Sequence, residues 1–548
     1  MNILELSEQE IGRRQSLQEL RNMGIDPYPA AEFPVNATSE DIKANFKDDE
    51  KREVTIAGRL MTKRIMGKAS FAELQDGKGR IQLYISRDDL CPGEDKDLYN
   101  KVFKKLMDIG DIVGVKGYAF RTQMGEISVH VEELTMLSKS LKPLPIVKYK
   151  DGVAYDKFDD PEMRARQRYV DLVVNDGVKE TFIKRATVLR TMRDFFDKHG
   201  YTEVETPILQ NIPGGASARP FITHFNALDT DMYMRIATEL YLKRLIVGGF
   251  DGVYEIGKNF RNEGMDKFHN PEFTCMELYV PYKDYNWMMK FTEELLETIC
   301  VAVNGTDEVE YQGKTISYKA PFKRIPILDA IKEKTGYDLN GLSEEEIRDI
   351  ALNKLKIETV DETAGKGKLI DEIFGEYCEG TFIQPTFIID YPVEMSPLTK
   401  MHRSKPGLTE RFELMVNGKE LANAYSELND PIDQEQRFID QMKLADKGDR
   451  LVMLVTGKEN IQEVMPFPQL KPEAKMPQST VKEWAELGVE ENWVYVLRKA
   501  GFNLISDIKD QKAQGLQQKL GDINKKYKLG YEKPSVEEIQ KWIDGAKA

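Results

Sequence analysis

Two clusters of polar and aromatic residues stand out in this chain of 548 residues. The first runs from Gly257 to Tyr279 and combines Arg261 with carboxylates, a histidine and aromatic rings. A guanidinium group suits bidentate binding of phosphate oxygens, an aromatic ring can stack on a purine, and a glutamate can hold an amine. The cluster therefore predicts half of an ATP site on two adjacent strands, and it points to activation of a carboxylate by ATP.

The second cluster carries Glu413 and Glu420, seven positions apart. Between them, Asn417-Gly418 is typical of a tight hairpin turn, which would bring both carboxylates to one end of a site. Such hard oxygen ligands suit a Mg²⁺ ion that bridges triphosphate oxygens. Asn423 and Glu427 are expected on a neighbouring strand, where a buried carboxylate would select a substrate ammonium. An ordinary polar hairpin would explain either cluster alone, but the two together favour a site.

Composition places these clusters in a soluble protein of two to four domains. Hydrophobic residues make up 41% of the chain and charged residues 31%, and no apolar run approaches the roughly 20 residues of a membrane span. The N-terminus does not resemble a signal peptide. Four scattered cysteines without metal-ligand spacing indicate a reducing cytosol.

The net charge of -14 argues against bulk binding of nucleic acid, although charge is uneven along the chain. Seven basic residues lie in the stretch from Arg59 to Arg87, whereas the same stretch contains only two acidic residues, Glu73 and Asp76. A local basic face of this kind can bind a polyanion. A solvated loop surface explains the same residues equally well.

The hydrophobic patterns predict an α+β protein of several parts. A helix and a linker are expected over residues 1–52, and five alternating segments with one helix at Leu98–Met107 predict an OB-type β-barrel over 53–140. Residues 141–175 read as a linker. A mixed region follows over 176–475, beginning with a helix at Asp176–His199 and containing a helical insertion at about 300–375. Short helices are predicted over 477–548.

Over about residues 1–475, the chain resembles the class II lysyl-tRNA synthetases of bacterial type. The helix that ends in Tyr201–Pro207 is similar to motif 1, which forms the dimer interface in that family, and Gly257–Glu277 is similar to motif 2. Three further segments are similar to the family's lysine-specific features: Pro213–Ala216, Ala237–Lys243 and Ser426–Asp430. The resemblance implies an antiparallel-sheet catalytic domain flanked by helices, preceded by the barrel.

The resemblance also implies an activity and its residues. A cytoplasmic homodimer would use ATP and Mg²⁺ to convert L-lysine to lysyl-adenylate, and would transfer lysine to tRNA(Lys). The catalytic arginines would be Arg261 and Arg450. The implied sites are Arg261, Glu263, His269, Phe273 and Arg450 for ATP; Gly215, Glu239, Glu277, Tyr279, Asn423 and Glu427 for lysine; Glu413 and Glu420 for Mg²⁺; and Arg64, Phe71, Gln82 and Glu126 for the anticodon.

The chain departs from the family before Arg450, which stands where the arginine of motif 3 is expected. The family has a glycine-rich strand there, whereas this sequence passes directly from Asp449 to Arg450. Loss of a central strand would strip its neighbours of ladder partners. Residues omitted from the printed sequence are the favoured explanation, because both flanks match the family; a true deletion and a gene-sequence error are the others.

Two alternatives to an active lysine–tRNA ligase follow. One is a catalytically impaired RNA-binding homologue, motivated by this gap. The other is an enzyme that attaches lysine to a protein, which the predicted barrel disfavours because such paralogues lack it. Residues 477–548 lie beyond the usual end of the family. Turns such as Leu520–Ile523 are similar to helix-hairpin-helix modules, but a nearly balanced charge favours a packing or assembly role.

Overall fold

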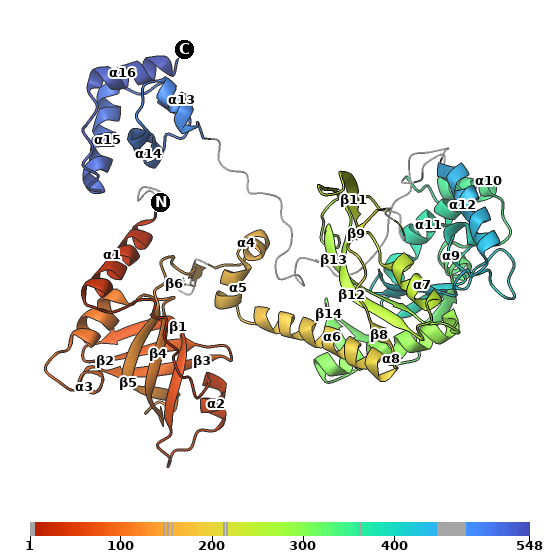
Figure 1. Ribbon diagram of the computed structural model, residues 1–548, viewed down its shortest axis with the longest axis horizontal. Helices are drawn as coiled ribbons and strands as arrows, with labels where there is room; N and C mark the ends of the chain where they lie inside the picture. The colour runs from red at the N-terminus through yellow and green to blue at the C-terminus, as the bar shows by residue number, and fades with distance from the viewer. Residues whose placement is uncertain are drawn as a thin grey trace. The chain divides into compact units, whose positions relative to one another are not determined.

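The computed structural model describes residues 6–145, 157–211, 214, 218–358, 360, 364–445 and 478–547, with the backbone alone at Lys148–Lys150, Val153–Tyr155 and 440–445 (Figure 1). The chain divides into two compact units. The first combines Met1–Lys157 with Pro472–Ala548, and the second is Phe158–Lys471. Among the described residues, no helix is both long and apolar enough to cross a bilayer.

The N-terminal part of the first unit is a five-stranded closed barrel with strand order β1-β2-β3-β5-β4 (Figure 1). The barrel prediction is thereby confirmed. Residues alternate between buried and half-buried along β2 and β3, so one face of each strand fills the barrel. The elements are α1 (Glu8–Asn22), α2 (Ser39–Ala44), β1 (Glu53–Met66), β2 (Ala69–Gln75), β3 (Arg80–Ser86), α3 (Arg87–Leu90), the π-helix η2 (Leu98–Leu106), β4 (Ile112–Arg121) and β5 (Ile127–Ser138).

The C-terminal part of the first unit is a small all-helical body with its own apolar core, which includes Trp484, Trp493 and Trp542. Two of its helices begin with a reciprocal capping box, at Thr480 and Ser535. Its elements are α13 (Val481–Glu486), α14 (Glu491–Lys499), η7 (Ile505–Ile508), α15 (Ala513–Lys526) and α16 (Val536–Gly545).

The second unit begins with helices in a region expected to be a linker. Before them, β6 (Lys148–Lys150) pairs with β7 (Val153–Tyr155). The helices are α4 (Pro161–Arg166), which Asp160 caps, and α5 (Arg168–Val174). The buried carboxylate of Asp171 joins them, because it accepts hydrogen bonds from Arg164 (2.8 Å) and Arg168. The linker prediction for 141–175 missed these helices because each is shorter than two full turns.

Two sheets of the second unit carry the candidate site. One has the order β13-β12-β8, and the other has the order β16-β17-β18-β19. Helices α6 and α8 pack against each other. The elements up to α8 are α6 (Val178–Lys198), β8 (Thr202–Glu203), β9 (Leu209–Gln210), β10 (Ile222–Phe225), β11 (Thr230–Met234), α7 (Glu239–Val247), β12 (Val253–Phe260), β13 (Glu272–Tyr279) and α8 (Tyr285–Asn304).

The prediction of a helical insertion over 300–375 is wrong for its first third, which contains strands. A hairpin of β14 (Glu308–Tyr311) and β15 (Lys314–Ser317) turns at Gln312 and Gly313, which both have positive φ, as a two-residue hairpin turn requires. The elements from there on are β16 (Lys323–Pro326), α9 (Ile327–Thr335), α10 (Glu344–Asp349), η3 (Ile350–Lys354), α11 (Lys366–Tyr377), η4 (Glu379–Thr381), β17 (Thr386–Ile389), η5 (Val393–Met395), β18 (Arg411–Val416), β19 (Lys419–Tyr425) and α12 (Pro431–Ala445).

Candidate functional site

The first polar cluster of the sequence lies on the antiparallel pair β12–β13, which agrees with its expected placement on adjacent strands. The register sets Phe273 opposite Asn259, and Glu277 opposite Glu255. Gly257 is required in this pair, because an added Cβ would lie 2.3 Å from a guanidinium nitrogen of Arg235. Strand β12 is therefore held at its centre by a buried arginine, and its polar residues cluster at its end.

The residues expected to bind ATP follow that end. The amide of Arg261 donates to the carbonyl of Pro271 at 2.8 Å, which closes the loop between the two strands. The guanidinium carbon of Arg261 lies 5.2 Å from the ring centroid of Phe273. His269 lies in the same loop, with Nδ1 at 2.7 Å from a carboxylate oxygen of Asp266. The loop and the start of β13 thus present a guanidinium, an imidazole and an aromatic ring.

Glu263 ties this loop to a distant segment. Its carboxylate accepts a long hydrogen bond of 3.4 Å from the amide of Arg219, while the amide of Asn262 donates to the carbonyl of Arg219 at 2.7 Å.

Burial tends to raise the pKa of Asp266, but hydrogen bonds from His269 and two backbone amides prevail and lower it. Asp266 is therefore ionised near neutral pH and orients the ring of His269.

Three of the carboxylates and phenols expected to bind an amine come together beside this loop. Glu277 accepts from the amide of Thr238 and from the hydroxyl of Tyr279, both at 3.2 Å. Glu239, which begins α7, accepts from the hydroxyl of Tyr425 at 2.7 Å. These contacts join β13, α7 and β19 around one acidic pocket.

Burial dominates the electrostatics of this pocket. It raises the pKa of Glu277 above its ordinary value, and the hydrogen bonds from Thr238 and Tyr279 oppose this only in part. Burial, together with the carboxylates of Glu277 and Glu239, raises the pKa of Tyr279 well above its ordinary value, so the phenol stays neutral. A cationic ligand would relieve the cost of these buried carboxylates, which is why the pocket suits an ammonium group.

Lys243 already places an ammonium in this pocket. Its Nζ contacts the carboxylate of Glu239 on the same helix and lies 2.8 Å from a carboxylate oxygen of Glu427, which follows β19. Sequence reasoning quoted Lys243 only as part of a motif and did not assign it a role. The spacing of four residues between Glu239 and Lys243 on a helix is the signal that could have found the pair.

The second polar cluster forms the expected hairpin. Strands β18 and β19 pair antiparallel around Asn417 and Gly418, both with positive φ. A register shift between Leu414 and Met415 sets Glu420 opposite Met415. Asn423 lies on β19 itself, opposite Glu413, so its expected placement on a neighbouring strand is wrong, because β19 continues past Glu420 to Tyr425.

Glu413 and Glu420 differ in their partners. Glu413 accepts from the hydroxyl of Tyr391 at 2.8 Å and pairs with Arg411, whose guanidinium also donates to Asn423 at 3.2 Å. Glu420 is 5% exposed, and among the described residues its Oε1 atom has no hydrogen-bond partner. Burial and the nearby Glu413 carboxylate raise the pKa of Glu420 well above its ordinary value. A buried carboxylate of this kind needs either a proton or a cation.

These residues fit a magnesium ion, because carboxylate oxygens are its preferred ligands and one of them is buried without a partner among the residues that the structure describes. The described residues contain no group of three His, Cys, Asp or Glu side chains arranged to hold a metal alone. Any ion at Glu413 and Glu420 would therefore share its shell with another ligand, as Mg²⁺ does with phosphates. Lys419 of the hairpin lies 4.7 Å from the ring centroid of Phe268, so the two polar clusters meet.

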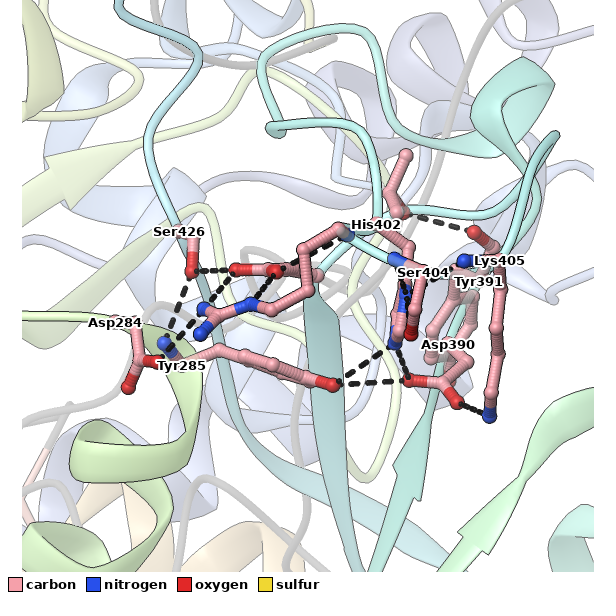
Figure 2. A network of polar contacts seen from close by, with 11 residues as sticks. Asp284, Tyr285, Asp390, Tyr391, His402, Ser404, Lys405 and Ser426 are labelled. Atoms are coloured by element: carbon pink, nitrogen blue, oxygen red, sulfur yellow. Dashed lines mark hydrogen bonds and ion pairs between the residues drawn. The ribbon is translucent and has the colours of Figure 1, made fainter.

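A polar network links Asp390, which follows β17, to Ser426, which follows β19 and precedes Glu427 in the sequence (Figure 2). Ser426 donates to Glu410 at 2.7 Å and accepts from the amide of Tyr285 at 3.0 Å. The hydroxyl of Tyr285 lies 3.2 Å from Asp390, which also pairs with Lys405. Glu410 is held in turn by the guanidinium of Arg403.

His402 is part of the same network. Its Nδ1 accepts from the amides of Ser404 and Lys405, both at 3.1 Å, and its Nε2 lies 3.4 Å from the hydroxyl of Tyr285 (Figure 2). The network fixes the backbone at Ser426, and with it the start of the Glu427 side chain. Sequence reasoning missed these residues, because the bend at Asp390, with φ of 60°, has no glycine to mark it.

The barrel of the first unit carries an aromatic face. Phe71 of β2 contacts Tyr84 of β3 at a centroid distance of 5.3 Å, and Tyr84 continues to Phe120 and His130 at 5.9 and 5.1 Å. The neighbours of Phe71 along β2 are buried, so its side chain points outward. Phe71 is therefore not part of the barrel core.

The other residues expected to bind bases lie around this face. Arg64 is the register partner of Phe71 on β1, and Gln82 precedes Tyr84 by two positions on β3, which places it on the same face. Gln82 accepts from the hydroxyl of Ser128 at 3.0 Å. Glu126 lies in the turn before β5, 3.6 Å from Lys43.

Part of the expected basic face has a structural role instead. The ammonium of Lys63 donates to the carbonyls of Phe103 (3.0 Å) and Met107 (2.6 Å) at the end of η2, and burial lowers its pKa. Arg59 donates to the carbonyl of Gly110 at 2.7 Å. These two cations stabilise the barrel and do not contribute to a free basic surface.

Two expected site residues, Gly215 and Arg450, lie outside the described residues.

Comparison with known families agrees with both the site of the second unit and the barrel of the first. Residues 160–448 match the model described as tRNA synthetases class II (D, K and N), and residues 54–137 match the OB-fold nucleic acid binding domain. Residues 478–548 match a domain of unknown function. The chain therefore belongs to the class II tRNA synthetases.

The most similar relatives narrow the class to the lysine–tRNA ligases. The chain is 61% identical to the lysine–tRNA ligase of Porphyromonas gingivalis W83, over 99% of both chains, and 56% identical to that of Christiangramia forsetii, over 94% of both. The lysine–tRNA ligase of Azobacteroides pseudotrichonymphae is 58% identical, and 99% of its length covers 85% of this chain.

These alignments bear on the departure from the family before Arg450. The alignment with the W83 relative is 574 residues long, whereas this chain has 548, so the relative carries at least 26 residues, the difference, that this chain does not. The family match also ends at residue 448, next to the junction of Asp449 and Arg450.

Proposed function

We propose that this chain is an ATP-dependent lysine–tRNA ligase that activates L-lysine as lysyl-adenylate and transfers it to tRNA(Lys). Within the family, the observation that carries the choice of amino acid is the acidic pocket of Glu239, Glu277 and Glu427. It already accommodates one ammonium group, that of Lys243, which lies 2.8 Å from Glu427. A substrate with a cationic side chain suits such a pocket. An uncharged analogue would leave the carboxylates of the pocket unpaired and would therefore be rejected.

The chemistry requires no covalent intermediate on the protein. The lysine carboxylate attacks the α-phosphorus of ATP and pyrophosphate leaves; a terminal hydroxyl of the tRNA then attacks the carbonyl of the adenylate and AMP leaves. Positioning and charge stabilisation supply the catalysis. We assign contact with the α-phosphate to Arg261, and the adenine to Phe273 and His269, with Glu263 in the same nucleotide site. Arg450 is proposed for the far end of the triphosphate.

Lysine is assigned to Glu239, Glu277, Tyr279, Asn423 and Glu427, with Gly215 near the α-amino group. Glu413 and Glu420 would hold Mg²⁺, which when bound would neutralise triphosphate charge. The support for this assignment is the buried Oε1 of Glu420, which has no hydrogen-bond partner in the described part of the chain, together with the raised pKa of Glu420.

We assign the tRNA anticodon to the outer face of the barrel. Unpaired bases can stack on the outward ring of Phe71, while Arg64, Gln82 and Glu126 supply donors and acceptors around it. The half-buried state of the whole aromatic face supports this role, since the barrel interior is filled by other side chains.

We further propose a homodimer in the cytoplasm. Helix α6, similar to motif 1, has 21 residues, of which only Val178, Phe195 and Phe196 are buried. Large apolar side chains are exposed on it and on the strands that follow: Ile183, Ile208, Leu209, Ile222 and Phe225. All four cysteines are free, and three of them are buried, which suits a reducing compartment. Sedimentation velocity tests the dimer, and a monomer at micromolar concentration would contradict it.

Lysine-dependent exchange of pyrophosphate into ATP tests the function, followed by charging of tRNA(Lys). We expect exchange with L-lysine and none with norleucine, which lacks the side-chain ammonium. Absence of exchange by the purified full-length protein, with magnesium present, would refute the proposed activity.

A further inference from the structure

Lys243 lies at the centre of the acidic pocket although it belongs to the protein. It follows Glu239 by one turn of α7, and its Nζ bridges Glu239 to Glu427, which is almost two hundred residues later in the chain. The Nζ atom also lies 5.9 Å from the ring centroid of Tyr425. Its side chain is 23% exposed, so most of it is shielded from water.

The bridge uses one oxygen of each carboxylate. Oε1 of Glu239 accepts from both Lys243 and Tyr425, and Oε1 of Glu427 lies 2.8 Å from Lys243. Among the described residues, no hydrogen bond is formed by Oε2 of Glu239 or of Glu427. Each carboxylate therefore keeps a free oxygen for a ligand while Lys243 remains in place.

We propose that Lys243 is a specificity-determining positioning residue. Its ammonium is a resident counter-ion that holds Glu239 and Glu427 at a fixed separation, and it matches the charge of the pocket to a substrate with two amines. This inference rests on the proposed lysine activation. The cluster has three carboxylates, on Glu239, Glu277 and Glu427, and one ammonium, on Lys243, so two carboxylates remain to be matched. The two ammonium groups of L-lysine match these two carboxylates.

The rival role for Lys243 is that of a placeholder, which the substrate ammonium would displace. Displacement would take Lys243 away from Oε1 of Glu239 and Oε1 of Glu427 only to put another ammonium there, although Oε2 of each carboxylate can receive a ligand while Lys243 stays in place. Before substrate arrives, Glu239, which is 6% exposed, needs Lys243, because the hydroxyl of Tyr425 alone is a costly partner for a buried carboxylate. Burial alone would lower the pKa of Lys243, but Glu239 and Glu427 raise it, so this ammonium stays charged.

The test compares the full-length protein with Lys243→Met, Lys243→Gln and Lys243→Arg. Calorimetry gives the affinity for L-lysine independently of turnover, and pyrophosphate exchange gives KM and kcat. We expect the Met and Gln variants to bind lysine at least tenfold more weakly, mainly through KM, and Arg to recover part of the loss. Lys332→Met is the matched control, because it removes an exposed ammonium paired with Asp338 at 2.7 Å.

The pH profile separates this role from a merely structural one. Glu239 and Glu427 contact Lys243, and Tyr425 lies beside it; Glu277 and Tyr279 interact electrostatically with Glu239, and Arg411 with Tyr425. Both tyrosines stay neutral because their pKa values are raised. Lys243 lowers the pKa of Glu427, so without the ammonium this pKa rises further. On acidification, lysine binding should therefore be lost at a higher pH in the neutral variants than in the wild type. The control should keep the wild-type profile.

Each result decides the matter. Tighter lysine binding by both neutral variants would establish the placeholder role, and a wild-type pH profile with wild-type affinity would establish a structural one; either overturns the inference. If one neutral variant does not fold, the other supplies the result. A wild-type protein that binds lysine without exchange would refute the proposed activity and leave the inference standing, whereas a wild-type protein that binds no lysine overturns both.

Discussion

Replacing Phe71 with alanine should separate the two reactions of the enzyme. Phe71 points out of the barrel and its ring contacts Tyr84 at a centroid distance of 5.3 Å, so its loss should disturb the barrel core little. Stacking of one base on an aromatic ring contributes about 1–3 kcal/mol. At about 1.4 kcal/mol for each factor of ten, kcat/KM for tRNA(Lys) should fall roughly 5- to 150-fold.

The assay pairs tRNA charging with pyrophosphate exchange on the same protein preparation. All the residues assigned to ATP and lysine lie in the second unit, Phe158–Lys471, so exchange should keep its wild-type rate. Phe71→Trp, which preserves a stacking surface, should charge tRNA close to the wild-type rate. A tRNA with a replaced anticodon should show no further loss with the alanine variant. An equal fall in exchange and charging, or unchanged charging of tRNA(Lys), would refute the assignment of Phe71 to the anticodon.

Three further predictions concern the second unit. Arg261→Lys keeps the charge but loses the planar fork, so kcat for exchange should fall about 10²- to 10³-fold while lysine affinity, measured by calorimetry, stays the same. The pKa of Glu420 is raised, so this carboxylate is protonated up to a higher pH than usual. Magnesium binding should therefore strengthen as pH rises and should release a proton, which calorimetry in buffers of different ionisation enthalpy detects. Glu420→Gln should abolish this proton release. If residues are missing before Arg450, the intact mass of the protein should exceed 62.9 kDa by at least about 3 kDa. This is the mass of 26 residues at the mean residue mass of this chain, 62.9 kDa divided by 548. A measured mass of 62.9 kDa would show that the deletion is real.

The sequence predicted best those parts whose pattern repeats locally. The alternation along Ala69–Gln75 and Arg80–Ser86 is a period of two, which depends only on neighbouring residues, and both segments are barrel strands. The turn at Asn417-Gly418 has a backbone requirement that few residues satisfy, and it does join β18 to β19. Local chemistry therefore predicted the strands and the hairpin that carry the site.

Long-range pairing set the limits of that prediction. Asn423 was expected on another strand, because nothing local shows how far a strand continues after its turn. The bridge from Lys243 to Glu427 depends on where α7 packs against β19, which the i,i+4 spacing alone does not determine. The bend at Asp390 likewise owes its conformation to surrounding contacts, since its carboxylate pairs with Lys405 and accepts from Tyr285.

The two sides of the active site differ in how completely the described residues satisfy them. On the lysine side, Glu239, Glu277 and Glu427 all have hydrogen-bonding or charged partners. On the nucleotide side, Oε1 of Glu420 is buried without one among the described residues. The family match ends at residue 448, and the relatives carry at least 26 further residues. Residues absent from this chain should therefore affect ATP more than lysine, and the two affinities can be lost separately.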